Sequence, residues 1–131
     1  MGRPTTTKSG GICFAFPNVC LTQVGPATVP IPYPSIGQLS DTNGTASSVL
    51  VAGNEVVVES SEISSTTGDS AGQAGVKSGT IGGNVKFTLS PSTTVFAEGK
   101  GIVRMFDQTW QNNENAVGVV LGGEPTVLTG G

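Results

Sequence analysis

An alternation of prolines at Pro30, Pro32 and Pro34 is the feature that most constrains how this chain can fold. Each proline removes a backbone donor and disfavours the α region for the residue before it, so the segment cannot be helical. The backbone is instead held extended, close to polyproline II, which leaves Ile31 and Tyr33 free to pack. Because a strand that lacks half of its N–H groups cannot lie inside a sheet, we predict that the segment lines an edge or a base. A stiff, exposed element of this kind suits a docking part better than a catalytic one.

The composition predicts one small all-β domain. A chain of 131 residues is long enough for a modest core. Its 20 glycines and 8 prolines are compatible with disorder, but valines cluster at 56–58 and 117–121, as strands require. No window has apolar residues at helical spacing without an interrupting Gly or Pro. We therefore expect short antiparallel strands and hairpins with little or no helix, in a single domain over residues 11–131 that follows a flexible tail, residues 1–10.

The charge pattern excludes several classes of partner. Charged residues make up 11% of the chain, the net charge is −3, and only six residues are Lys or Arg, so a footprint for nucleic acid is lacking. No apolar run reaches the roughly 20 residues of a membrane span, and we expect no stable membrane insertion. The segment 1–11 is polar and has no apolar region of a cleaved signal peptide. We expect synthesis in the cytosol, with any export by a route other than general secretion.

The residue types also argue against catalysis. The chain has no histidine, so the usual general base for a serine or cysteine nucleophile is missing. Cys13 and Cys20 are interpreted as reduced thiols, because the chain would have to turn at Pro17-Asn18 before they could bridge. Trp110 fits an exposed anchor and a core side chain equally well. We predict no catalytic residue and no cofactor, and interpret the scattered carboxylates as a solubilising surface: Glu59, Glu62, Asp69 and Glu98.

One strand pattern occurs three times along the chain. Each copy places a hydroxyl residue, a valine and a bulky residue ahead of a glycine. We predict two hairpins from the first two copies, turning at Gly53-Asn54 and at 99–101, and a third strand of the same design. The unequal spacing excludes a solenoid and fits similar elements around an axis, with long surface turns at 68–83 and 108–116. The copies are residues 47–53, 93–99 and 125–131.

The N-terminal third carries two specific motifs. The first is Phe14-Ala15-Phe16-Pro17-Asn18-Val19-Cys20-Leu21-Thr22, and the second is Val29-Pro30-Ile31-Pro32-Tyr33-Pro34. Together they resemble the signature of the PAAR-like proteins of bacterial type VI secretion systems, and the likeness continues to the end of the chain. The resemblance implies a cone of short antiparallel strands with pseudo-threefold character. Its base would sit on the blunt end of a trimeric, β-helical VgrG-type spike protein.

The resemblance also implies a function. The chain would be a non-enzymatic tip that caps the spike, one chain per trimer, and links it to effector cargo or an adaptor. Assembly would take place in the bacterial cytoplasm, and the type VI system would then secrete the tip into the target cell or the medium. The alternative is the tip of a toxin effector whose enzymatic part lies elsewhere. A free-standing carbohydrate- or surface-binding β-domain would need an exposed aromatic platform, which five Phe, one Tyr and one Trp scarcely supply.

The sequence departs from the family pattern at the metal site. Related tips hold zinc near the apex through several His and a Cys, whereas only Cys13 and Cys20 could ligate zinc here, so we expect a metal-free tip. A single chain that caps a threefold surface needs three similar edges. We therefore expect the proline segment and the repeated strands to dock on the spike through Pro30, Ile31, Pro32, Tyr33, Pro34, Val49, Val51, Val95, Ala97, Val127 and Leu128.

Overall fold

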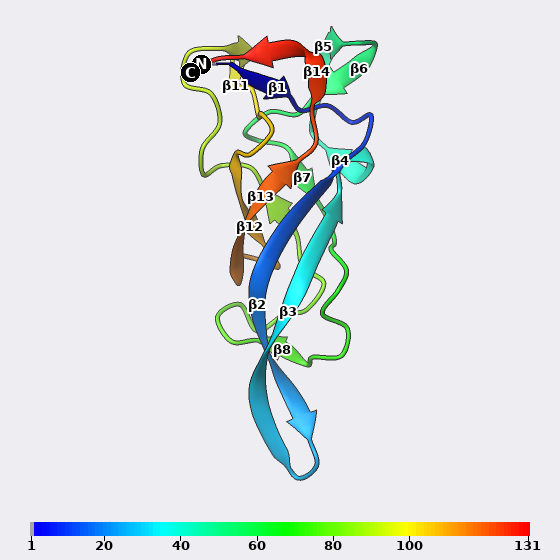
Figure 1. The fold of residues 1–131 in the computed structure, drawn as a ribbon, viewed down its shortest axis with the longest axis vertical. Coiled ribbons are helices and arrows are strands. Elements are labelled where there is room, and N and C mark those ends of the chain that lie inside the picture. The colour runs from blue at the N-terminus through cyan, green and yellow to red at the C-terminus, as the bar shows by residue number, and fades with distance from the viewer. Residues whose placement is uncertain (1) are drawn as a thin grey trace.

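A computed structural model describes residues 2–131, and the chain tapers from a broad end to a projecting hairpin (Figure 1). The hairpin is formed by β2 (Ile12–Val24) and β3 (Ala27–Gln38), and both chain ends lie at the broad end. Among the described residues the one helical segment is the 3-10 turn η1 (Leu39–Asp41), which is too short to cross a membrane. The predicted all-β, cone-shaped fold is confirmed.

Eight antiparallel strands make the main sheet. Seven of them follow the order β3-β2-β13-β12-β9-β7-β4, and β8 pairs with β2 beside this path. One face of the sheet packs on a core that includes Cys13, Ile63, Val85 and Val120, together with Leu39 and Phe87 from the connections. The remaining strands of this sheet are β4 (Thr42–Asn43), β7 (Glu62–Ile63), β8 (Ala74–Gly75), β9 (Val85–Lys86), β12 (Gln108–Gln111) and β13 (Ala116–Leu121).

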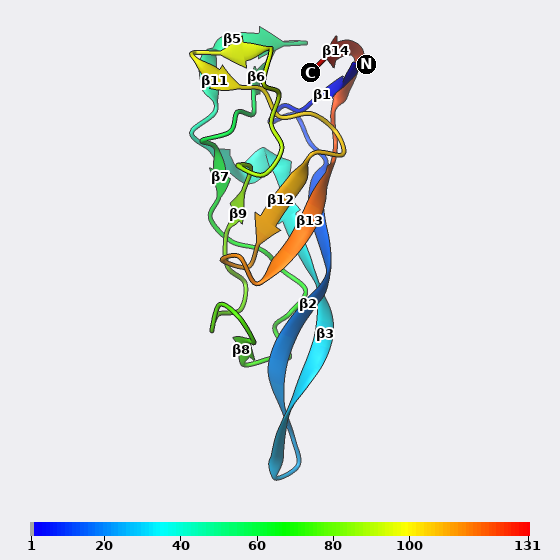
Figure 2. The ribbon, with the colours of Figure 1, turned by 90° about the vertical axis from the view of Figure 1, so that its left-hand side faces the viewer.

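Three two-stranded ribbons lie together at the broad end (Figures 1 and 2). Each of the three sequence copies supplies one strand to one ribbon, which gives the repeat a structural meaning. A second core of Ala46, Val56, Val58, Ala97 and Ile102 joins the first two ribbons. The ribbons are β5 (Ala46–Val51) with β6 (Asn54–Val56), β10 (Phe96–Ala97) with β11 (Lys100–Gly101), and β1 (Arg3–Thr5) with β14 (Glu124–Thr129).

The two tight hairpins turn at equivalent positions, Ala52-Gly53 and Glu98-Gly99. Val51 pairs with Asn54 and Ala97 with Lys100, so each turn begins one residue earlier than the sequence pattern predicted. In both turns the two central residues have positive φ, 52° and 80° in the first and 52° and 78° in the second. Such turns match the right-handed twist of the strands they join. They require positive φ at both central residues, and glycine meets this requirement most often at the second of them.

The proline segment forms the outer half of an edge strand, as predicted. β3 is the terminal strand of the main sheet, and Pro30 and Pro32 lie opposite Leu21 and Val19 of β2. A strand without these N–H groups can pair on one side only, and the free side is poorly suited to edge-to-edge association.

Residues 2–10 differ from the expected flexible tail. β1 pairs with β14, the backbone N–H of Thr6 donates to Val103 O at 3.0 Å, and Thr5, Thr6 and Thr7 are buried. The hydroxyl of Thr5 bonds that of Thr129 at 2.6 Å. The sequence pattern of these threonines predicts a polar tail, but a buried hydroxyl is tolerated when it has a hydrogen-bond partner.

The segment 108–116 is also more ordered than the predicted surface turn. β12 is an interior strand of the main sheet, between β13 and β9. Gln111 is fully buried, and its side-chain amide donates to Ser35 O at 2.9 Å. The tight turn that follows contains three residues with positive φ: Asn112, Asn113 and Glu114. The polar side chain of Gln111 therefore forms part of the interior, because backbone carbonyls accept its hydrogen bonds.

A candidate docking surface at the broad end

Three large apolar side chains project from the broad end at equivalent positions of the repeat. They are Leu50 on β5, Phe96 on β10 and Leu128 on β14, and they are 58%, 57% and 61% exposed. Each occupies the bulky position of its copy. Exposed side chains of this size are usually scattered, whereas these three share one end of the molecule and one place in a repeated unit.

The predicted docking residues of the ribbons differ in their exposure. Val95, Val127 and Leu128 are exposed, at 37%, 38% and 61%. Val49 and Val51 pack against the second core, and Ala97 belongs to it. Leu50 and Phe96 were missed as candidates, although strand alternation identifies them: a neighbour of an inward-facing residue faces outward.

The proline segment lies apart from the ribbons. Pro30 to Pro34 belongs to the narrow half of the molecule, on the flank that leads to the hairpin tip (Figure 1). Tyr33 is partly buried there, and its hydroxyl bonds that of Thr22 at 2.8 Å. One flat contact at the broad end therefore does not include this segment.

Carboxylates brace the repeated strands. Glu98 accepts from both the backbone N–H and the hydroxyl of Ser48, at 2.8 and 2.5 Å, and so joins the second ribbon to the first. Glu124 accepts the corresponding two bonds from Thr126 within the third ribbon, at 3.2 and 2.6 Å. These hydrogen bonds lower the pKa of each carboxyl, first through the hydroxyl and then through the backbone donor. The nearby Lys100 lowers the pKa of Glu98 further.

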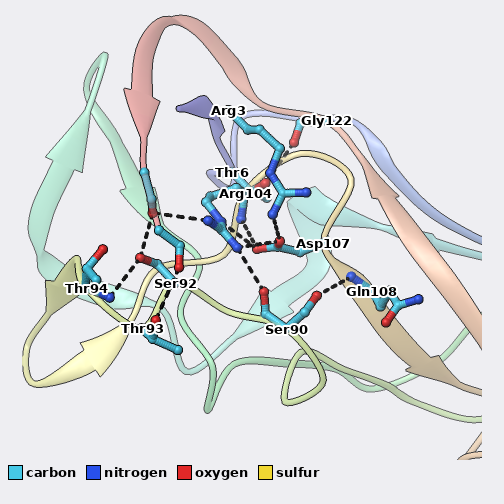
Figure 3. Close-up of polar contacts among 12 residues, drawn as sticks. Arg3, Thr6, Ser90, Ser92, Thr93, Thr94, Arg104, Asp107, Gln108 and Gly122 are labelled. Atoms are coloured by element: carbon cyan, nitrogen blue, oxygen red, sulfur yellow. Dashed lines mark hydrogen bonds and ion pairs between the residues drawn. The ribbon is translucent and has the colours of Figure 1, made fainter. Parts of the chain in front are cut away.

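A buried ion cluster ties the two chain ends together beneath the ribbons (Figure 3). Arg104 donates to both oxygens of Asp107, from Nε at 3.1 Å and from Nη2 at 2.9 Å, and Arg3 forms a second ion pair with the same carboxylate. The Arg104 guanidinium also donates to Gly130 O and Ser90 O, each at 3.1 Å. Arg104 and Asp107 are 6% and 2% exposed. We call Arg3, Arg104 and Asp107 the clasp.

The clasp reaches the second ribbon through one hydroxyl. Ser92 donates to Gly130 O at 2.8 Å and accepts from the N–H of Val95 at 3.0 Å. Figure 3 shows Ser92 beside Arg104, with its further bond to Thr94. The carbonyl of Gly130, at the end of the third ribbon, therefore accepts both from Arg104 of the clasp and from Ser92, which precedes the second ribbon. The three apolar side chains rest on ribbons that are fixed relative to one another.

A different network organises the narrow half. Asn18 is fully buried, and its oxygen accepts from the side-chain amides of Asn112 at 3.1 Å and Asn115 at 2.6 Å. Its own amide donates to Asp69 at 2.9 Å, and Asp69 accepts from the N–H of Gly82 at 3.0 Å. We call Asn18, Asp69, Asn112 and Asn115 the amide network. It connects β2 to the loop before β8 and to the turn between β12 and β13.

Neither cysteine has the surroundings of a reactive thiol. Both are free and buried, and burial raises the pKa of Cys13 to about 12. Burial also raises the pKa of Cys20, with a further contribution from the charge of Asp69. Within residues 2–131 no group of three or more Cys, Asp or Glu side chains is placed to hold a metal ion, and no pocket is present.

Comparisons with known proteins agree with this architecture. Residues 11–118 match the family described as the toxin PAAR-like domain. The chain is also 36% identical over 112 residues to the DNase toxin Tse7 of Pseudomonas aeruginosa, a match that covers 79% of this chain and 29% of that protein. The chain thus spans less than a third of the length of this relative. No solved structure matches the chain. The family match extends over most of the chain, and the chain belongs to the toxin PAAR-like domain family.

Proposed function

We propose that this domain is the tip of a type VI secretion spike and that its broad end caps a trimeric VgrG-type spike protein. The observation that carries the proposal is the presence of three equivalent, exposed apolar side chains, Leu50, Phe96 and Leu128, on three ribbons of one chain. A threefold partner presents three identical sites. A single chain can complement them only through an internal repeat of this kind.

The docking mode follows from the ribbons. Each is two-stranded, so each has a free edge, and the edge can accept a strand from one spike subunit while the apolar side chain beside it is buried. Burying each of these side chains would contribute roughly 1.5–3 kcal/mol before the cost of association. One tip would bind one trimer. The predicted contribution of Pro30 to Pro34 would be stiffness of the flank rather than direct contact with the spike.

The test measures how tightly variants of the domain, each with a single substitution that introduces a charge, bind a VgrG-type spike trimer. We expect Phe96→Asp to weaken binding at least tenfold, because a carboxylate would be placed in an apolar contact. Val24→Asp is the matched control, since Val24 is 50% exposed but lies at the hairpin tip. Loss of binding in the Val24 variant with full binding in the Phe96 variant would overturn the assignment.

A second candidate is that this domain is one part of a longer toxin effector. The relative Tse7 is a DNase toxin of which the match covers 29%. On this view the tip carries no catalytic residue, and the activity belongs to another part of the protein. An antibody against the domain would decide between the two on whole-cell extract: a species near 13.1 kDa supports a free tip linked to separate cargo, and a much larger species supports the effector.

Both candidates imply the same route. The domain would be assembled on the spike in the bacterial cytoplasm and delivered by contraction of the secretion system into the target cell or the medium. Its appearance in the culture supernatant should depend on an intact type VI apparatus. Supernatant levels that are equal in a strain without the sheath would contradict this route.

A further inference from the structure

One asparagine of this protein differs from the others in its bonding. The chain has seven asparagines, and all but Asn43 donate a side-chain hydrogen bond within the protein. The six that do so are Asn18, Asn54, Asn84, Asn112, Asn113 and Asn115. The side chain of Asn43 is exposed and makes no hydrogen bond to any residue between 2 and 131. Its carboxamide is therefore accessible and can rotate.

The residue after Asn43 favours a reaction of this carboxamide. The backbone nitrogen of the next residue can attack the side-chain carbonyl carbon of an asparagine, and a Cβ on that next residue obstructs the approach. Gly44 carries no Cβ, and its φ of 72° lies in the left-handed region. None of the other six asparagines is followed by glycine. Bonding and sequence therefore single out the same residue.

Asn43 also lies where the backbone can rearrange. It is the second and last residue of β4, the terminal strand of the main sheet, and it pairs with Glu62 of β7. An extended backbone points the Gly44 nitrogen away from the Asn43 side chain, so the attack requires rotation about the Cα–C bond of Asn43. The end of a two-residue edge strand opens more readily than the interior of a sheet, and this opening permits the rotation.

We propose that Asn43 is a site of spontaneous deamidation. The Gly44 nitrogen loses its proton to water and attacks Cγ of Asn43, and the new C–N bond closes a succinimide ring. The side-chain nitrogen leaves as ammonia and takes up a proton from water. A second water then opens the ring: cleavage at Cγ gives aspartate, and cleavage at the backbone carbonyl gives isoaspartate, through which the chain is one methylene longer. Water is the single co-reactant, and no oxidation or reduction takes place.

Both products disturb the contacts around β4. Aspartate places a negative charge opposite Glu62, and like charges directly opposite each other in a sheet are destabilising. Isoaspartate displaces Gly44, whose carbonyl accepts from the Ser61 hydroxyl at 3.1 Å. The same hydroxyl accepts from the N–H of Val58, a member of the second core, at 3.0 Å. Deamidation therefore loosens the junction between the edge of the main sheet and the ribbons.

The experiment is peptide mapping of the purified domain during a long incubation, with fragment spectra that assign each gain in mass to one residue. We expect Asn43 to deamidate at least roughly tenfold faster than any other asparagine. The rate should rise between about pH 6 and about pH 8, because the attacking nitrogen must lose its proton. Labelling with an isoaspartyl methyltransferase and its methyl donor distinguishes isoaspartate from aspartate. An unmodified Asn43, or another asparagine that reacts as fast, would overturn the proposal.

Matched substitutions locate the reaction and its consequence. Asn43→Gln keeps the carboxamide but requires a larger ring, so the gain in mass should disappear, whereas Asn54→Gln should leave it unchanged. A gain of the same size in Asn43→Gln would overturn the proposal. Asn43→Asp reproduces one product, and in it and in the incubated protein hydrogen exchange should rise in residues 42–45 and 61–63. Unchanged exchange in both would show that the modification leaves β4 in place, and would overturn the proposed consequence.

Discussion

The broad end and the narrow half of this small domain are held together by different chemistry. At the broad end three short ribbons are fixed by charged groups: the clasp beneath them and the Glu98–Ser48 bonds between them. In the narrow half a long ribbon stiffened by prolines is fixed by side-chain amides around Asn18 and by the carboxylate of Asp69, which accepts a hydrogen bond from Asn18. The comparison shows that the fold places its ion pairs where separate strands must keep a common geometry, and amide hydrogen bonds where one hairpin must be anchored.

The strongest test of this comparison is to break the clasp. Arg104→Met leaves the Asp107 carboxylate buried with Arg3 as its remaining ionic partner, and we expect a loss of about 3–5 kcal/mol in the free energy of unfolding. Urea denaturation measures it. The double variant Arg104→Met/Asp107→Leu should recover part of the loss because no buried carboxylate remains, and Arg3, which loses its partner, is 35% exposed and can be solvated. A double variant less stable than the single one would contradict the account.

The amide network should have a smaller and more local effect. Asn18→Leu removes one hydrogen bond from each of the buried side chains of Asp69, Asn112 and Asn115, which keep their bonds to Gly82, Thr80 and Val19, at a cost of about 2–4 kcal/mol in total. Hydrogen exchange should rise in residues 69–83 and 112–115, while the ribbons of the broad end keep their protection. Equal loss of protection at both ends would show that the two halves do not differ as described.

A proline directly before β10 of the second ribbon tests the stability of the broad end alone. The N–H of Val95 donates to Ser92 Oγ, so Val95→Pro removes one hydrogen bond and restrains Thr94, at a cost of about 1–2 kcal/mol. Val95→Thr keeps the N–H and the β-branching and should be nearly neutral. Thermal melts of the two variants give the comparison, and equal melting temperatures would exclude a structural role for this bond.

The smallest effect concerns the Glu98 brace. The folded-state pKa of Glu98 is lowered by Ser48, so this bond contributes stability above the unfolded-state pKa of the carboxyl, and that contribution is lost as the pH falls through the lower, folded-state value. In Ser48→Ala the pKa of Glu98 should rise toward its ordinary value. Carboxyl chemical shifts followed by NMR between about pH 2 and 6 measure it. An unchanged pKa would mean that the brace is absent in solution.

Particular residues show how far the sequence determines this structure. The prolines of β3 and the triple repeat predict an edge strand and three similar strands, because both depend on local backbone chemistry. Leu50 and Phe96 could have been found from strand alternation within the same repeat. The clasp could not, since Arg3 and Asp107 are 104 residues apart and only the paired strands bring them together. The burial of Thr5 and Asn18 likewise depends on distant partners that no local pattern specifies.

The central claim is that one chain supplies all three contacts to a threefold partner, and the mass of the assembled complex tests it most directly. Native mass spectrometry of the domain mixed in excess with a VgrG-type spike trimer should show the trimer plus a single added mass of about 13.1 kDa. The same spectrum with Phe96→Asp should show mostly free trimer. Three added chains per trimer would mean that each ribbon set docks separately, and would contradict the account.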